Sequence, residues 1–126
     1  MTSRREARRE ALVLLFQWDV TGKPLGSLYE GEADPWAVEL ARSVIEHAED
    51  LDARIGAAAI DWDVERLGSV ERSVLRIALH ELDRGDPPLE VVLDEAVRLA
   101  RRYASDDAAR LVNGILGRIA REQERV

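Results

Sequence analysis

Residues 87–119 constrain the fold more than any other segment, because their apolar residues recur at the spacing of two consecutive helices. Ser105 lies between the two runs and can cap free backbone N–H groups, while Asp106 and Asp107 would lie at the positive end of a helix dipole. The segment therefore predicts two helices that bury these positions together. They are Leu93, Ala96, Val97, Ala100 and Ala104 in the first run and Ala108, Leu111, Val112, Ile115, Leu116 and Ile119 in the second.

Two glycines, Gly114 and Gly117, lie well inside the second of these predicted helices. A glycine in a helix interior costs about 1 kcal/mol relative to alanine, so a close neighbouring element is expected on this side. The residues favour backbone-to-backbone packing at the two glycines, with Asn113 hydrogen-bonded to a nearby helix end. The alternative is that Asn113 lies on a binding surface.

The N-terminal segment predicts a helix over residues 4–21 with an arginine cluster at its start. Ser3 and Glu6 fit a capping box, and a rotation of about 100° per residue separates the helix into two faces. The core side carries Ala7, Ala11, Leu14, Leu15 and Trp18, the opposite side carries Arg5, Arg9 and Phe16 with Leu12 beside them, and Arg4 and Arg8 lie between.

Two interpretations of this arginine face stay open from the residues alone. It is either a solvated charged face, with Phe16 covered by the loop that follows, or a surface where unstacked bases lie on the ring and guanidinium groups bind phosphates. The formal net charge of the chain is −7, which argues against non-specific nucleic-acid binding by the protein as a whole. The charge is unevenly distributed, however, because the arginines crowd the N-terminus.

The remaining segments extend the helical pattern through the chain. Asp34 and Pro35 begin a predicted helix, Asp50 is expected to cap a further one, and another runs from about Ser69 to Gly85. The turn at residues 61–63 is the expected seam between two halves. Since no strand pattern of useful length is present, the sequence predicts an all-α protein. We expect a single domain of about seven helices, in two packed halves that span roughly residues 1–61 and 62–126.

The composition and the residue spacing favour a binding module over an enzyme. The chain has no cysteine and only two histidines, His47 and His80, neither of which has a partner at metal-ligand spacing. No nucleophile and base are arranged for catalysis, so we expect no catalytic residue, no metal and no cofactor. No apolar run approaches the ~20 residues of a membrane span, and no signal-peptide pattern opens the chain. A soluble cytoplasmic protein is expected.

Several motifs occur together in an order that is hard to produce by chance. They are Phe16-Gln17-Trp18 after the arginine cluster, the run over residues 70–82, Asp94-Glu95-Ala96, and Val112-Asn113-Gly114. With these motifs the chain resembles the NusB family of transcription antitermination factors over nearly its whole length. The C-terminal half carries most of the specificity of this resemblance.

The resemblance implies a helical protein that binds the boxA element of nascent RNA together with NusE, a small-subunit ribosomal protein. The pair would join RNA polymerase in an antitermination complex. Phe16 stands where tyrosine is common in the family, Leu111 stands where phenylalanine is usual, and Glu6 interrupts the basic cluster. The candidate RNA-binding residues are Arg4, Arg5, Arg8, Arg9, Phe16, Leu111 and Asn113.

For NusE, the resemblance points to Glu71, Arg76 and Asp107, where an acidic surface would face a basic ribosomal protein. The sequence leaves two alternatives to this function. NusB-like domains also resemble the N-terminal part of certain ribosomal RNA cytosine methyltransferases, but a Rossmann-type catalytic domain does not fit within 126 residues. The second alternative is a helical interaction protein or homodimer without an RNA role. Nucleic-acid binding measured at several salt concentrations would distinguish this alternative from the RNA-binding function.

Overall fold

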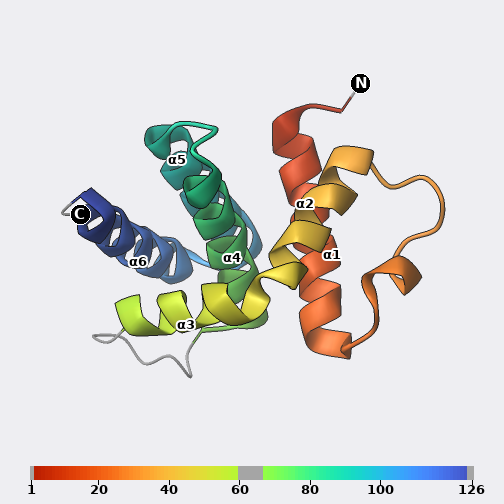
Figure 1. Ribbon diagram of the computed structural model, residues 1–126, viewed down its shortest axis with the longest axis horizontal. Coiled ribbons are helices and arrows are strands. Elements are labelled where there is room, and N and C mark those ends of the chain that lie inside the picture. Colours follow the sequence, from red (N-terminus) through yellow and green to blue (C-terminus); the bar gives the residue numbers. More distant parts are fainter. Residues whose placement is uncertain (1, 60–66, 125–126) are drawn as a thin grey trace.

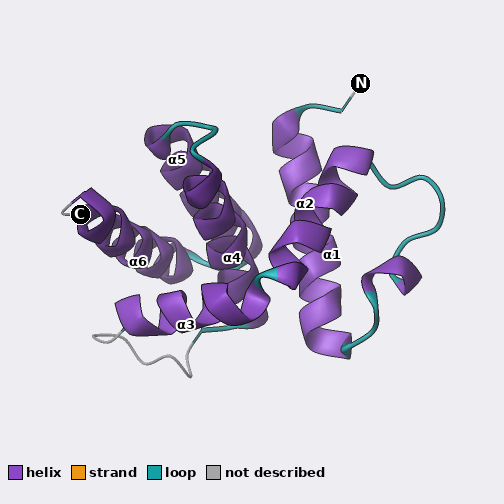
Figure 2. Ribbon diagram, in the orientation of Figure 1, coloured by secondary structure: helices purple, strands orange, loops and turns teal. Residues whose placement is uncertain are grey.

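The computed structural model describes residues 2–59 and 67–124, and every regular element in these two ranges is a helix (Figures 1 and 2). The predicted turn at residues 61–63 lies outside the described residues. The all-α prediction is confirmed, and the described helices agree with the expected number of about seven. They are α1 (Arg4–Thr21), the 3-10 helix η1 (Leu25–Ser27), α2 (Pro35–Glu46), α3 (Ala48–Ala58), α4 (Ser69–Arg84), α5 (Leu89–Tyr103) and α6 (Asp106–Glu124).

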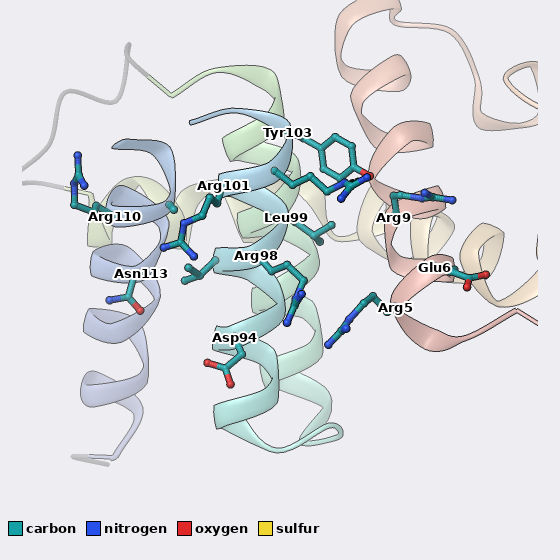
Figure 3. Close-up of a pocket in the computed structure, with 13 residues that line it drawn as sticks. Arg5, Glu6, Arg9, Asp94, Arg98, Leu99, Arg101, Tyr103, Arg110 and Asn113 are labelled. Atoms are coloured by element: carbon teal, nitrogen blue, oxygen red, sulfur yellow. Dashed lines mark hydrogen bonds between the residues drawn. The ribbon is translucent and has the colours of Figure 1, made fainter. Parts of the chain in front are cut away.

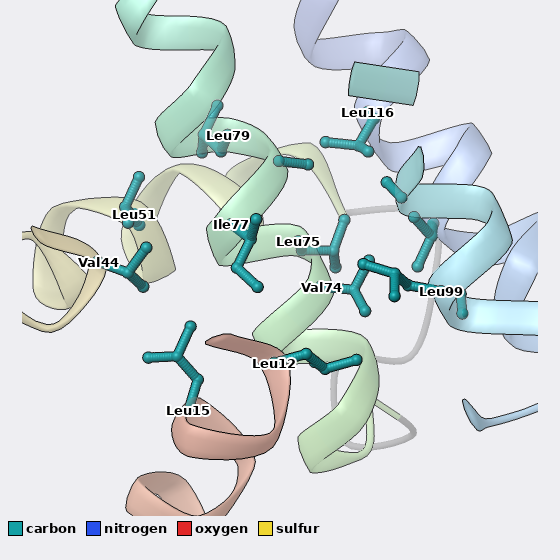
Figure 4. Packing of buried hydrophobic residues seen from close by; sticks show 14 of the residues in the cluster. Leu12, Leu15, Val44, Leu51, Val74, Leu75, Ile77, Leu79, Leu99 and Leu116 are labelled. Carbon is teal, nitrogen blue, oxygen red and sulfur yellow. The ribbon is translucent and has the colours of Figure 1, made fainter. Parts of the chain in front are cut away.

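Helix α4 lies at the centre of the packing and contacts each of the other described α-helices. Figure 4 shows Leu75 and Ile77 of α4 in the core, with Leu15 of α1 on one side and Leu116 of α6 on another. Helix α1 also packs along α2, and α5 packs along α6. Helix α3 belongs to the predicted first half, yet it contacts α4 and α6 as well as α2. One continuous hydrophobic cluster therefore joins all six α-helices.

Four helix ends lie where the capping residues predicted them. The Ser3 hydroxyl accepts a hydrogen bond from the backbone N–H of Glu6 at 3.1 Å, and Ser105 accepts one from Ala108 at 3.0 Å. The Asp34 carboxylate caps α2 by accepting from two backbone N–H groups. Gly85 ends α4 with a φ of 77°, a left-handed conformation that glycine adopts without steric cost.

Helices α5 and α6 form the predicted pair. Ala96, Val112 and Ile115 are buried, and Leu93 and Leu111 are half-buried against the same hydrophobic cluster. The apolar spacing therefore predicted which faces meet, while the outer two leucines lie at the margin of the core. Ala104, which was also predicted to be buried, is exposed just after the end of α5.

Three local predictions were wrong. Leu12, which was predicted to lie beside the exposed arginines of α1, is buried. Helix α1 packs against both α2 and α4, so it buries a wider face than a single apolar stripe. Helix α3 begins at Ala48, which places Asp50 inside its first turn and not at its cap. At Gly117, a side chain would meet the guanidinium of Arg121, one turn along the same helix. Among the described residues, no backbone of another element approaches Gly117 closely enough to require glycine.

A network of charged side chains joins the end of α1 to α4 and α3. Asp19 accepts hydrogen bonds from Ser69 at 2.5 Å, from Arg72 at 2.8 Å and from Arg76 at 3.1 Å. Arg76 also donates to both carboxylate oxygens of Asp52, at 2.7 and 2.8 Å. Burial by itself would raise the pKa of Asp19, but these hydrogen bonds and the charge of Arg76 outweigh it and lower the pKa to about 2.

We expect Asp19→Asn to lower the free energy of unfolding by about 1–2 kcal/mol at pH 7, a linkage value discounted for partial solvent exposure. The folded pKa of Asp19 is about 2 against an ordinary value of 3.8. Its contribution is therefore complete above about pH 4 and is lost as the pH falls toward 2. Urea unfolding at several pH values should show the two proteins converging near pH 2. A difference that is independent of pH would contradict this assignment.

Candidate nucleic-acid interface

An open cleft of about 870 Å³ lies between α1, α5 and α6 (Figure 3). Its lining includes six arginines and only two carboxylates, those of Glu6 and Asp94. A local excess of positive charge in a chain with a net charge of −7 suits an anionic ligand. We refer to this site as the arginine cleft, and its arginines are Arg5, Arg9, Arg98, Arg101, Arg102 and Arg110.

Helix α1 contributes Arg5 and Arg9, which are one helical turn apart and therefore lie on the same face. The Arg5 guanidinium donates to Glu95 of α5 through Nε at 3.1 Å and through Nη2 at 2.9 Å. These hydrogen bonds, and the negative charge of Glu95, raise the pKa of Arg5. In the described ranges no carboxylate lies within ion-pair distance of Arg9, so its positive charge is the less neutralised of the two.

Helix α5 supplies the opposite wall. Arg98, Arg101 and Arg102 follow one another at helical spacing and form an exposed face beside the buried residues of this helix. Arg102 donates from Nε to the Tyr103 hydroxyl at 3.2 Å and lies 5.6 Å from the centre of its ring. The Tyr103 side chain is 38% exposed and lines the cleft. An exposed ring beside a guanidinium is an arrangement on which a nucleic-acid base can stack.

Helix α6 closes the site with Arg110 and Asn113. Asn113 is exposed and lines the cleft. Of the two predicted alternatives, a position on a binding surface therefore fits the structure better than a hydrogen bond to a nearby helix end. Its amide offers both donors and an acceptor to a ligand. Two arginines at this end are partly neutralised, because Arg101 lies 3.3 Å from Asp106 and Arg110 pairs with Asp107.

The structure brings only part of the predicted RNA-binding set to this cleft. Arg5, Arg9 and Asn113 line it. Arg4 is exposed but lies over the ring of Trp36, with its guanidinium carbon 4.5 Å from the ring centre. Leu111 is half-buried against the core and does not line the cleft.

Arg8 differs most from its predicted role as an RNA contact. It is 7% exposed, and its guanidinium forms a fork with the buried carboxylate of Glu81, through Nε at 2.9 Å and Nη2 at 2.9 Å. The helical rotation placed Arg8 at the edge of the exposed face, but α4 covers that edge. The structure therefore corrects this position: Arg8 joins α1 to α4 and presents no open guanidinium to a ligand.

Phe16 lies two turns beyond Arg9 on α1 and is 38% exposed. The loop after α1 therefore does not cover the ring fully. Val13 and Val20 are exposed near it at spacings of three and four residues. A row of apolar side chains thus continues along α1 from the arginines that line the cleft.

The three predicted NusE-binding residues have different environments. Asp107 is exposed in the first turn of α6. The half-buried Glu71 caps α4, where its carboxylate accepts from the backbone N–H of Gly68. Arg76 is 4% exposed and holds Asp19 and Asp52, so it is corrected from a surface contact to an interior residue.

Sequence reasoning missed the arginines of α5, Tyr103 and Arg110. A usable signal was present, because Arg98, Arg101 and Arg102 recur at helical spacing and are polar, beside the apolar positions Ala96 and Leu99. That signal identifies an exposed basic face. It could not show that α1, about ninety residues earlier, lies beside this face and turns it into a cleft.

Other kinds of site find no support in the described residues. No group of three or more His, Cys, Asp or Glu side chains there could hold a metal ion. His47 and His80 lie with ring centres 6.1 Å apart, and burial lowers the pKa of His80, assisted by the charges of Arg84 and His47. Within the same ranges, no helix has the length and apolar character needed to cross a membrane.

The fold and the cleft together define an all-helical protein with a cationic surface site that includes the ring of Tyr103. A comparison with known protein families identifies the family of this chain. The NusB family model matches residues 5–121, and the chain belongs to the NusB family.

Individual relatives agree with this assignment over nearly the whole chain. The transcription antitermination protein NusB of Solibacter usitatus (strain Ellin6076) is 38% identical, over 97% of this chain and 91% of its own. The solved T. maritima NusB has a TM-score of 0.82 at 34% identity and covers 96% of this chain and 92% of its own. A crystal structure of antitermination factors NusB and NusE in complex with dsRNA has a TM-score of 0.82 at 29% identity, with coverages of 94% and 96%.

Proposed function

We propose that this chain is a transcription antitermination factor that binds boxA RNA in the arginine cleft, acts together with NusE, and joins the RNA polymerase antitermination complex. The observation that carries the RNA site is the concentration of six arginines around one cleft of an acidic protein. The names of the relatives support the antitermination role. The similar fold of a NusB that was crystallised with NusE and dsRNA supports both partners.

In this proposal the residues that line the cleft, together with Phe16 farther along α1, make different contacts with RNA. Arg9 and Arg102 bind phosphates of a single strand, while Tyr103 and Phe16 offer rings for unstacked bases. Asn113 can read a base edge through its amide. Arg4 adds positive charge beside the site, and Arg8 positions α1 through Glu81. A chain of this kind acts by binding and not by catalysis, and we place it in the cytoplasm, where bacterial transcription occurs.

The experiment that tests the function is an anisotropy titration of labelled boxA RNA over a range of salt concentrations, with and without NusE. We expect weak binding by the chain alone, because its overall charge opposes RNA. NusE should strengthen binding, and RNA should strengthen NusE binding by the same factor. A matched RNA of scrambled sequence is the control. Absence of RNA binding in both arms would favour a helical interaction protein or homodimer, for which the exposed row of Val13, Phe16 and Val20 offers a contact surface.

We expect Phe16→Ala to lower RNA affinity about 10-fold without changing the salt dependence. A stacked base contributes roughly 1–3 kcal/mol, and the lower part of this range fits a ring that is 38% exposed. Val13→Ala is the matched control, because Val13 is an exposed apolar residue on the same helix but has no ring. A Phe16→Ala protein that melts early yet binds RNA fully when folded would indicate a packing role for the ring.

We expect Asp107→Lys to weaken NusE binding about 3-fold to 5-fold and to lower the melting temperature only slightly, because it places a cation in the first turn of α6. Asp107 is exposed, so an ion pair to a basic partner contributes roughly 1 kcal/mol or less and is weakened by salt. Glu39→Lys makes the same charge change on α2, where Glu39 is also exposed. Calorimetric titration of NusE should separate the two variants. Equal affinities would place the partner surface elsewhere.

A further inference from the structure

Glu95 is a buried carboxylate at the edge of an arginine-lined site. It lies on α5 and its side chain is 12% exposed, whereas the Arg5 side chain that it binds is 60% exposed. Arg5 donates through Nε at 3.1 and 3.4 Å to the two oxygens and through Nη2 at 2.9 Å to one of them. The second nearby arginine, Arg98, is 4.0 Å away and is too distant for a hydrogen bond.

This geometry leaves part of Arg5 available to a ligand. A guanidinium has five N–H donors in one plane. Glu95 uses the Nε–H and one Nη2–H, so both Nη1–H groups and the second Nη2–H have no acceptor in this pair. Arg5 also lines the arginine cleft. The carboxylate therefore holds one edge of the guanidinium while the opposite edge can face the cleft.

Comparison with the second arginine fork of α1 shows that this arrangement is not a general feature of the helix. Arg8 donates through Nε and Nη2 to different oxygens of Glu81, whereas the two shorter bonds from Arg5 share one oxygen of Glu95. Both side chains of the Arg8–Glu81 pair are buried, with 9% and 6% exposure. That pair can only join α1 to α4. The Arg5–Glu95 pair is asymmetric, because the carboxylate is buried and the guanidinium is exposed. A buried carboxylate can therefore orient a cation that remains accessible to a ligand.

We infer that Glu95 is a positioning residue for RNA: it fixes the Arg5 guanidinium so that its free edge binds a backbone phosphate. The inference rests on the proposed function. It also predicts that neutralising Glu95 changes RNA affinity in the direction opposite to that expected from charge alone. A carboxylate near an RNA site repels phosphate, so its neutralisation should strengthen binding if charge were its only effect. If it orients Arg5, neutralisation should weaken binding although the net positive charge of the cleft increases.

The test compares Glu95→Gln with Glu90→Gln, which removes the same charge from an exposed position of α5 outside the cleft lining. We expect Glu95→Gln to lower affinity for single-stranded RNA about 5-fold. The salt slope should fall by roughly 0.7, the value for one lost phosphate contact on a single strand. Glu90→Gln should leave both unchanged. Tighter binding by Glu95→Gln, or an unaltered slope, would overturn the inference.

Two further variants separate positioning from folding and from the proposed function itself. Arg5→Lys keeps the charge at an exposed site but cannot form the fork, so it should lose affinity about as much as Glu95→Gln; wild-type affinity would overturn the inference even if Glu95→Gln does not fold. In an Arg5→Ala background, Glu95→Gln should have no further weakening effect. If Arg9→Ala weakens binding while both Glu95→Gln and Arg5→Lys bind like wild type, the RNA site stands and only the role of Glu95 fails.

Discussion

Arg8→Ala is expected to lower the free energy of unfolding by about 3–5 kcal/mol, although arginine is usually a surface residue. The substitution leaves the Glu81 carboxylate, which is 4% exposed, buried without the fork that now satisfies it. Breaking one partner of a buried ion pair has this cost, because the remaining charge is neither hydrated nor compensated. Urea unfolding followed by far-ultraviolet circular dichroism measures it directly.

The double variant Arg8→Met/Glu81→Leu is the informative control for this prediction. It removes both charges and keeps side chains of similar length, so it should recover most of the lost stability. Arg5→Ala provides the contrast with an exposed arginine of the same helix and should change stability much less. If Arg8→Ala were as stable as the wild type and instead lost RNA binding, the role that the sequence predicted for Arg8 would be the correct one.

Much of the fold follows from local patterns. The spacing of apolar residues predicted that α5 and α6 pair through Ala96, Val112 and Ile115, and these residues are buried together. Ser3, Asp34 and Ser105 marked helix starts, because their side-chain oxygens satisfy N–H groups that no earlier turn can reach. These features depend on residues within one or two turns of each other, which is why a single sequence suffices.

The fate of charged residues could not be predicted in the same way. Assigning residues to faces by their rotation around the helix assumes that only one side of the helix is buried. Helix α1, however, contacts both α2 and α4. Arg8 therefore lies inside, whereas Arg5, only three residues earlier, is open to solvent. Arg76 is buried because Asp19 and Asp52 come from two other helices to meet it. The sequence contains no local mark of such distant carboxylates.

The cleft itself depends on tertiary packing for the same reason. Its walls come from α1 on one side and from α5 and α6 on the other, and only Arg5, Arg9 and Asn113 were identified beforehand. Arg98 and Arg102 look like ordinary solvated residues until α1 is placed beside them. The resemblance to a family predicted the kind of ligand, whereas the packed structure predicts which side chains of this chain can reach it.

Reversal of the two least neutralised arginines of the cleft, in the variant Arg9→Glu/Arg102→Glu, is expected to lower RNA affinity about 100-fold. Each lost phosphate contact reduces affinity roughly 5-fold at 0.1 M salt, from the single-strand slope of about 0.7 per contact. Two lost contacts therefore account for about 25-fold, and the two new carboxylates add repulsion. The salt slope should also fall by roughly 1.4. In the described ranges, neither arginine has a carboxylate within ion-pair distance, so little stability should be lost with their charges.

A matched variant, Arg42→Glu/Arg121→Glu, decides whether position or net charge is responsible. It makes the same change of four charge units with two exposed arginines that lie outside the cleft lining. If the cleft binds RNA, this variant should bind much more tightly than the cleft variant, because neither substitution removes an arginine from the cleft lining. Equal losses in the two proteins would mean that RNA responds to the overall charge of the chain. That result would contradict the assignment of the arginine cleft as the RNA-binding site.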